Sequence, residues 1–374
     1  MKDNPLMALA KLGQSVWLDY IRRDLLSGGG LRRMIADDGL AGMTSNPAIF
    51  EKAISGSRDY DADINALARS GKKVGEVYEA LSLADIKTAA DQFRPLYDST
   101  SGADGYVSLE VNPHLAHDAG GTVREGRRLW QALARPNAMI KVPATVEGLE
   151  AVRTLIADGI NVNVTLLFGV PRYRLVAEAY LSGLEARAAQ GKELKNIASV
   201  ASFFISRIDT FVDPALEKAA ASGGGVSERA ANCAGQVAVA SAKAAHQACG
   251  EIFGGERFKQ LAAKGARAQR LLWASTGTKN PKYSDIKYVE ALIGPGTVNT
   301  VPPETLAAYR DHGAPENRLG QDFEQSRAVL EALPALGVDL EDVSRRLEED
   351  GIKKFNEPFD KLLSTIEARM KQQS

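Results

Sequence analysis

The sequence contains little cysteine or histidine, no excess of either charge and no long apolar run. Only Cys233 and Cys249 occur among 374 residues, and they lie in an alanine-rich stretch without histidines at ligand spacing. A disulfide framework or a zinc site needs more cysteine and histidine than this. We therefore interpret both cysteines as buried small hydrophobic residues.

The charges nearly cancel, with 46 Lys and Arg against 47 Asp and Glu. A chain without excess positive charge has nothing to attract a polyanion, so no nucleic-acid partner is expected. No segment approaches the roughly 20 consecutive apolar residues of a membrane span, and the first residues lack the apolar core of a signal peptide. We therefore expect a cytoplasmic protein with no membrane partner.

Short β-rich runs alternate with long helical patterns, which is typical of a parallel sheet built from βα units. The predicted strands are Ser15–Tyr20, Leu40–Asn46, Gly105–Val111, Ala138–Pro143, Ile160–Phe168, Ala198–Ile205, Arg270–Ser275 and Gly296–Pro302. Eight is the number of parallel strands that closes a barrel. The sequence therefore predicts an α/β protein, with residues 1–374 forming a single (β/α)8 TIM barrel domain with additional helices.

Helical patterns fill the intervals between these strands. Amphipathic stretches cover Val170–Gln190 and Ser227–Cys249, and the long connection Glu51–Asp104 contains at least two further helical patterns. Several helices are expected after the last strand. The glycine-rich stretch Ala221–Glu228 has helical patterns on both sides, so we predict a loop between helices there and no domain boundary.

A lysine interrupts the apolar run AMIKVP, where Lys141 is either a surface charge or a desolvated amine kept for chemistry. Asp19, Asn46 and Glu110 end the three preceding predicted strands. Each alone could be a helix cap, a turn residue or a strand-end charge. In a barrel, however, these strand ends converge on one mouth, which is the usual catalytic face. The combination therefore favours a catalytic site.

Polar residues alternate with valines in the fifth predicted strand, NVNVT. Asn161, Asn163 and Thr165 share one face because side chains alternate along a strand. A solvated edge strand would give the same alternation, but the fifth of eight strands is poorly placed for an edge. We therefore predict that this face lines the barrel lumen.

Two later motifs indicate an anion-binding site. SFFISRID places Ser202 and Arg207 at the end of the sixth strand, and ASTGTKNP places Ser275 and Lys279 after the seventh. Phosphate sites in barrels often lie near strands seven and eight, where a glycine- and hydroxyl-rich loop exposes N–H donors. An ordinary turn would also suit Gly-Thr-Lys, so the prediction depends on the barrel context.

The motifs MTSNPAIF, IKVPAT, NVNVTLLF, SFFISRID and WASTGTKNP closely resemble those of the transaldolase family, from Asp19 to about Val301. The length and the STGTK loop are most similar to the longer bacterial type. The resemblance implies a class I enzyme of the non-oxidative pentose phosphate pathway that needs neither a metal nor an organic cofactor. Such enzymes move a dihydroxyacetone unit from sedoheptulose 7-phosphate or fructose 6-phosphate to glyceraldehyde 3-phosphate or erythrose 4-phosphate.

By motif match, the resemblance also implies four catalytic residues. Lys141 matches the Schiff-base lysine, and Asp19 matches the base for carbon–carbon cleavage. Glu110 and Thr165 match the pair that handles protons through a water molecule. A neutral amine attacks a ketone and the resulting iminium accepts electrons, and burial disfavours the charged form of a lysine.

The substrate-binding positions follow in the same way. Asn46, Asn163 and Ser202 match the residues that hold the dihydroxyacetone hydroxyls, and Arg207 and Ser275 match the phosphate ligands. Many relatives carry an arginine just after that serine, whereas here Thr276 and Gly277 follow and Lys279 is the nearest cation. We also expect Phe203 or Phe204, beside Ser202, to wall the pocket.

Two alternatives stay open at this point. The first is a class I fructose 6-phosphate aldolase that releases free dihydroxyacetone, which the sequence barely separates from a transferase. The second is a non-catalytic sugar-phosphate-binding barrel, which would need neither the lysine nor both carboxylates. The expected partners are small sugar phosphates, with the chain acting as a monomer or homodimer.

Overall fold

The computed structural model describes residues 4–371 and shows a closed barrel of parallel strands. The strands are β1 Gln14–Asp19, β2 Gly42–Thr44, β3 Tyr106–Glu110, β4 Ala138–Pro143, β5 Val162–Leu167, β6 Ser199–Phe204, β7 Arg270–Ala274 and β8 Thr297–Val301. Each strand pairs with its neighbour in sequence, and β8 pairs with β1. The predicted fold class is confirmed. The one-domain assignment over 1–374 stays a prediction, and its residues 1–3 and 372–374 lie outside the described part.

Helices alternate with the strands, and extra helices are inserted in the long connections. They are α1 Pro5–Lys11, α2 Arg23–Ser27, α3 Gly30–Asp38, α4 Pro47–Ser55, α5 Asp61–Arg69, α6 Val74–Ser99, the 3-10 helix η1 Pro113–Leu115, α7 Ala119–Leu133, α8 Val146–Asp158, α9 Val170–Ala189, α10 Ser206–Ala220, α11 Gly225–Cys233, α12 Val237–Gly254, α13 Glu256–Ala262, α14 Lys287–Ala291, α15 Pro303–His312, α16 Phe323–Ala332, the 3-10 helix η2 Pro334–Leu336 and α17 Leu340–Lys371.

Local sequence explains how β4 leads into α8. Thr145 caps the helix by accepting a hydrogen bond from the N–H of Gly148 at 3.0 Å, and α8 ends at Gly159 in the left-handed region, with φ of 90°. A Cβ on Gly148 would overlap the carbonyl oxygen of Pro143. Glycine therefore lets the first turn of α8 close directly over the end of the strand that carries Lys141.

The amphipathic stretch Ser227–Cys249 is helical, but it does not form one continuous helix. Two helices, α11 and α12, cover this region, and Gly235 lies between them with φ of 70°. Its N–H donates to Oδ1 of Asp213 at 2.8 Å, and a Cβ there would lie 2.6 Å from the hydroxyl of Tyr283. The apolar pattern runs through this glycine, so periodicity alone does not reveal the turn.

The two cysteines differ in burial. Cys233 is buried as predicted, whereas Cys249 is only partly buried, so that prediction is wrong. Neither forms a disulfide. The loop between α10 and α11 lies within the predicted Ala221–Glu228, with helices on both sides.

Inside the barrel, Trp17 of β1 lies against the backbone of its partner Gly42 on β2. A Cβ on Gly42 would come within 2.5 Å of the indole, so the large ring requires glycine on the neighbouring strand. The Trp17 ring also lies 6.3 Å from that of Tyr106 on β3. These large side chains fill the lumen below the strand ends.

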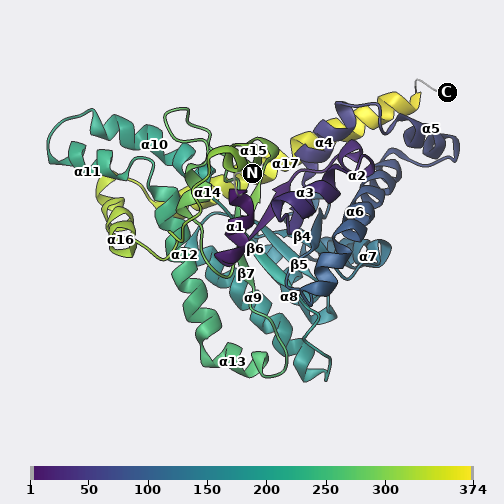
Figure 1. The fold of residues 1–374 in the computed structure, drawn as a ribbon, viewed down its shortest axis with the longest axis horizontal. Helices are drawn as coiled ribbons and strands as arrows, with labels where there is room; N and C mark the ends of the chain where they lie inside the picture. The colour runs from purple at the N-terminus through teal and green to yellow at the C-terminus, as the bar shows by residue number, and fades with distance from the viewer. Residues whose placement is uncertain (1–3, 372–374) are drawn as a thin grey trace.

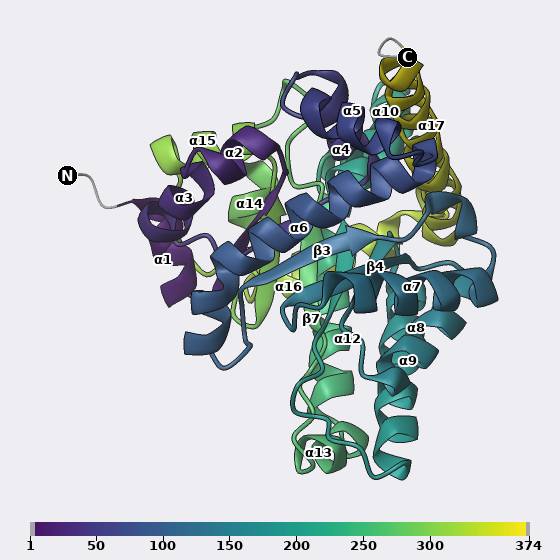
Figure 2. The same ribbon diagram turned by 90° about the vertical axis from the view of Figure 1, so that its right-hand side faces the viewer.

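The C-terminal helix α17 crosses the end of the barrel at which the strands terminate. Figure 1 shows it alongside α4 and α5, and Figure 2 shows α13 at the opposite end of the molecule. A Cβ on Gly351 of α17 would lie 2.8 Å from Cδ2 of Leu166 on β5. This close approach brings the next turn of α17 over the mouth.

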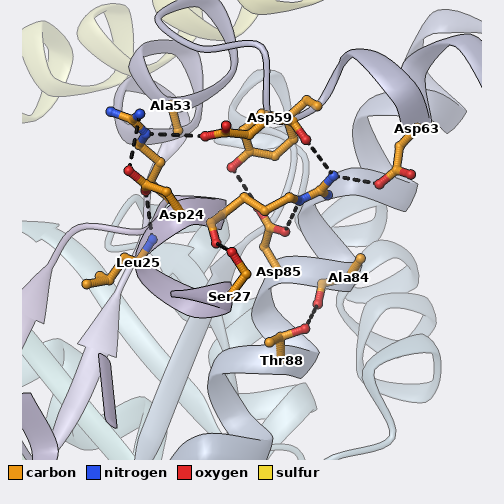
Figure 3. A network of polar contacts seen from close by, with 12 residues as sticks. Asp24, Leu25, Ser27, Ala53, Asp59, Asp63, Ala84, Asp85 and Thr88 are labelled. Atoms are coloured by element: carbon orange, nitrogen blue, oxygen red, sulfur yellow. Dashed lines mark hydrogen bonds and ion pairs between the residues drawn. The ribbon is translucent and has the colours of Figure 1, made fainter. Parts of the chain in front are cut away.

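A polar network ties the helices inserted between β2 and β3 to α2 (Figure 3). Nε of Arg23 donates to Oδ1 of Asp85 on α6 at 3.1 Å, and Nη1 donates to Oδ2 of Asp63 on α5 at 2.5 Å. The hydroxyl of Tyr60 donates to the other oxygen of Asp85 at 2.8 Å. Because Asp85 is buried, these donors are needed to compensate its lost hydration. Over residues 4–371, no helix is long and apolar enough to cross a membrane.

Candidate active site

Lys141 and Glu110 are neighbours at the ends of β4 and β3. The register of the two strands places them side by side, and Nζ of Lys141 lies 3.6 Å from Oε2 of Glu110. Only 4% of Lys141 and 8% of Glu110 is exposed. Nζ also donates to the carbonyl oxygen of Ser45 at 3.0 Å. Lys141 is therefore a desolvated amine and does not lie on the protein surface.

The carboxyl group of Glu110 has a pKa close to neutral pH. Burial raises its pKa to about 7, and the positive charge of Lys141 opposes that rise. Its Oε2 accepts no hydrogen bond from any described residue. A carboxyl group with a pKa near neutrality, beside an amine, is suited to general acid–base work.

The second carboxylate, Asp19, ends β1 on the other side of β2. Its Oδ1 accepts a hydrogen bond from Oγ1 of Thr44 at 2.7 Å, and the Thr44 and Thr300 hydroxyls lie 2.7 Å apart. Burial raises the pKa of Asp19, while Lys141 and the Thr44 hydrogen bond act in the opposite direction. Asp19 and Glu110 thus occupy different environments around one amine, which allows them separate tasks.

A cavity of about 390 Å³ opens at this end of the barrel. Its walls include most of the predicted site residues: Asp19, Asn46, Lys141, Thr165, Ser202, Phe204, Arg207, Ser275 and Lys279. Asn46 has both of the roles considered for it, because it lines the cavity and also caps α4 by accepting from the N–H of Ile49 at 3.0 Å.

Asn163 lies behind the cavity wall and supports it. Its Oδ1 accepts from the hydroxyl of Ser202 at 2.6 Å, and its Nδ2 donates to the hydroxyl of Ser108 at 3.0 Å. Asn161 lies just before β5 begins, and its amide bonds to the backbone of Pro136 and Ala198. On this alternating polar face, Asn161 therefore holds neighbouring backbone segments together, whereas Thr165 lines the cavity.

Thr165 lies at an irregular point of β5. The register with β6 shifts between Val164 and Leu167, and Leu166 has a positive φ of 57°. Among described residues, Oγ1 of Thr165 has no hydrogen-bond partner although it is buried. Bulges and left-handed non-glycine residues often aim side chains into functional sites. Here the hydroxyl faces the cavity that Lys141 also lines.

The cationic part of the cavity is built from the ends of β6 and β7. Arg207 lies in the first turn of α10, with its guanidinium 5.2 Å from the centroid of the Phe204 ring. Burial lowers its pKa, and its Nη1 has no hydrogen-bond partner in the described part of the chain. A half-buried guanidinium with a free donor is suited to an anionic ligand.

Ser275, just after β7, lines the same cavity as Arg207. It adopts a positive φ of 55°, and its carbonyl oxygen accepts from the N–H of Ser206 at 3.1 Å and from the Ser206 hydroxyl at 2.6 Å. Lys279 lines the same cavity. The predicted anion-binding residues are thus brought together.

The two phenylalanines point to opposite faces of β6. Phe204 lines the cavity, whereas Phe203 packs on the outer face with its ring 6.4 Å from that of Trp273. The expectation that at least one of them walls the pocket is met by Phe204. The alternation of side chains along a strand separates them.

Sequence reasoning missed several lining residues. Phe355 of α17 is buried, and its ring centroid lies 5.6 Å from Nζ of Lys141. The other missed lining residues include Tyr20, Thr44, Lys52, Thr300 and Glu304. Lys52 lies two residues beyond the MTSNPAIF motif, on the helix α4 that Asn46 caps. No local signal marks Phe355, because its position depends on how α17 docks.

The structure is thus a parallel (β/α)8 barrel whose mouth carries a buried lysine, two carboxylates and an arginine with one donor unpaired among residues 4–371, the arrangement of a lysine-based barrel enzyme. The sequence model described as Transaldolase/Fructose-6-phosphate aldolase matches residues 16–366. The chain belongs to this transaldolase/fructose-6-phosphate aldolase family.

Similar proteins cover nearly the whole chain. A protein named Transaldolase from Trichodesmium erythraeum is 47% identical over 375 residues, which is 99% of each chain. A Transaldolase from Thiobacillus denitrificans is 50% identical over 358 residues, covering 96% of this chain and 98% of the relative. A Transaldolase from Mycolicibacterium smegmatis is 45% identical over 372 residues, which is 99% of each.

Proposed function

We propose that this protein is a transaldolase that transfers a dihydroxyacetone unit from a ketose phosphate to an aldose phosphate through an imine on Lys141. The observation that carries the proposal is the buried Lys141–Glu110 pair, with Asp19 and Arg207 on the cavity that Lys141 lines. Family membership and the names of the relatives support it. Sedoheptulose 7-phosphate or fructose 6-phosphate would be the donor, and glyceraldehyde 3-phosphate or erythrose 4-phosphate the acceptor.

Imine formation uses the Lys141–Glu110 pair. Transfer of a proton toward Glu110 leaves a neutral amine, which attacks the ketone carbon of the donor. Glu110, with its pKa near 7, then returns a proton to the departing hydroxyl. The hydroxyl of Thr165, which has no hydrogen-bond partner among the described residues, would hold the water molecule that forms.

Carbon–carbon cleavage uses Asp19. The iminium withdraws electrons from the bond to be broken, while Asp19 accepts the proton of the neighbouring hydroxyl. Asn46 and Ser202 line the same cavity and are suited to hold the hydroxyls of the retained three-carbon unit. The aldose product leaves, and the acceptor aldehyde takes its place before the reverse sequence completes the transfer.

The test of this proposal is a two-substrate assay with fructose 6-phosphate and erythrose 4-phosphate. Transfer should give sedoheptulose 7-phosphate and glyceraldehyde 3-phosphate, with little free dihydroxyacetone. Equal release of free dihydroxyacetone with and without the acceptor would instead identify a fructose 6-phosphate aldolase. Binding of sugar phosphates without any turnover would indicate a non-catalytic sugar-phosphate-binding barrel.

The balance between transfer and hydrolysis should depend on Phe204. Replacing Phe204 with serine opens the cavity wall to water, so free dihydroxyacetone should rise about tenfold relative to transfer product. Phe204→Leu keeps the wall apolar and is the control. The measurement is the ratio of the two products at saturating acceptor. An unchanged ratio in Phe204→Ser would remove this role.

Phosphate recognition should depend on Arg207 and Lys279. Neutralising either as Arg207→Gln or Lys279→Gln should raise KM for phosphorylated donors about ten- to a hundredfold, or about 1.5–3 kcal/mol. Fructose and other unphosphorylated donors should be affected far less. Lys52→Gln removes an exposed cation from the same cavity and is the matched control. An equal penalty for both donor types would show that these cations serve structure.

Imine formation should be pH-dependent through the Lys141–Glu110 pair. Below a pH near 7, Glu110 already carries a proton and cannot accept one from the Lys141 ammonium, so the rate of imine formation should rise as pH increases through this range. Because the two groups are coupled, the apparent pKa belongs to the pair. Stopped-flow measurement between pH 5.5 and 9, in ~0.5-unit steps, should show this rise in the wild type and a flat profile in Glu110→Gln. A rise of the same size in Glu110→Gln would assign it to another group.

A further inference from the structure

A second cavity, of about 650 Å³, lies beside β3 and reaches Glu110. It is bounded by β3, α6, α7 and α17, and Figure 2 shows β3 running between α6 and α7 with α17 at their end. Glu110 lines this cavity, whereas Lys141 and Thr165 line the first one. Glu110 thus lines the second cavity and also places its Oε2 3.6 Å from the reacting amine.

The inner wall of the second cavity is polar. Oε1 of Glu125 on α7 accepts from the N–H of Asn112, just beyond Glu110, at 3.3 Å. Burial raises the pKa of Glu125 and also that of Tyr78, on which the charges of Glu110 and Glu125 act as well. Nη2 of Arg128 lies 3.7 Å from Oε1 of Glu125. Polar groups placed in this way give water molecules several partners.

The outer part of the cavity reaches the surface near the start of α6. Lys73, Gly75 and Glu76 line it there and are exposed. A Cβ on Gly75 would have no atom within 4 Å, so there is open space at this point. The cavity therefore links solvent to the back of Glu110 without passing through the mouth of the barrel.

We propose that this lateral cavity is the route by which the water released on imine formation leaves, and by which the water for imine hydrolysis enters. The proposal rests on the imine function proposed above. When the imine forms and when it is hydrolysed, an intact ketose phosphate would occupy the cavity that Phe355 lines, so the second cavity gives water a separate path at those two steps. Oε2 of Glu110, 3.6 Å from Nζ, is placed to hand protons to water from the cavity side.

The step balances with one water molecule. Nζ of Lys141 forms a bond to the ketone carbon, and the bond from that carbon to its oxygen breaks. Starting from the ammonium, two protons leave nitrogen for the departing oxygen, with Glu110 passing them on, and one proton stays on the iminium nitrogen. Hydrolysis returns the same atoms, so one water must leave and one must enter in each cycle.

Loss of ¹⁸O from the ketone of fructose 6-phosphate, measured without acceptor, reports whether the released water escapes before the imine reverses. Gly75→Trp places a ring in the open space of the cavity, and Leu363→Trp narrows it from α17. Either ring should slow enzyme-dependent ¹⁸O loss about tenfold, while KM for the donor and borohydride trapping of the imine change less than about twofold. Gly75→Ala and Thr88→Trp, a ring on the exposed face of α6, are the controls.

The outcomes separate the route from the chemistry. Slower ¹⁸O loss in at least one of the two tryptophan variants, with both controls unchanged, supports the route. Unchanged ¹⁸O loss in both folded tryptophan variants, or equal slowing in the controls, overturns it. Absence of a trapped imine in the wild type would instead overturn the proposed function on which the route depends.

Discussion

Lys141→Ala should abolish transfer, with kcat/KM falling at least about ten thousandfold, because it removes the amine that we propose forms the covalent intermediate. Lys141 is the lysine 3.6 Å from Glu110 and 5.6 Å from the centroid of the Phe355 ring, inside the cavity. The measurement is the coupled assay for glyceraldehyde 3-phosphate formed from fructose 6-phosphate and erythrose 4-phosphate.

The variant should remain folded. Truncation removes a desolvated amine, and Glu110 can take up a proton when its partner is lost because its pKa is already about 7. Circular dichroism and thermal unfolding check this point. Lys52→Ala, which removes an exposed lysine from the same cavity, should keep its turnover within about threefold. Undiminished activity in Lys141→Ala would contradict the proposed mechanism.

Asp19→Asn should lower kcat about a hundred- to ten thousandfold while leaving the imine able to form, because the amide cannot accept the hydroxyl proton during cleavage. Thr44 can still donate to the amide oxygen, so the side chain should keep its place. The measurement pairs turnover with borohydride trapping of the intact donor. Glu304→Gln, on the rim of the same cavity, is the control for loss of a carboxylate.

Loss of both turnover and borohydride trapping of the imine in Asp19→Asn would contradict this assignment. That outcome would place Asp19 in imine formation beside Glu110. Equal losses of turnover in Asp19→Asn and Glu304→Gln would indicate a general electrostatic effect on the cavity.

The arrangement of strand-end residues could be predicted because it follows from two geometric rules. Side chains alternate along a strand, and parallel strands in a barrel end at one mouth, so Lys141, Glu110 and Asp19 had to approach one another. The register that pairs Glu110 with Lys141 is a consequence of the same geometry. The same alternation places Phe204 and Phe203 on opposite faces of β6, although both residues are phenylalanine.

The parts that could not be predicted depend on long-range packing. Phe355 reaches the lysine only because Gly351 lets α17 approach Leu166, and no local pattern shows where a helix docks. The pKa of Glu110 depends on its burial in the folded chain, which no local pattern states. The break at Gly235 was hidden because the alanine-rich pattern continues through it.

Covalent trapping tests the central claim most directly. Sodium borohydride added to the wild-type protein with fructose 6-phosphate should reduce the imine and inactivate the enzyme. Peptide mass spectrometry should then find a single substrate-derived mass increase on the peptide that contains Lys141, and none in Lys141→Ala. A label on any other lysine, or full activity retained after borohydride with no label at all, would contradict the account.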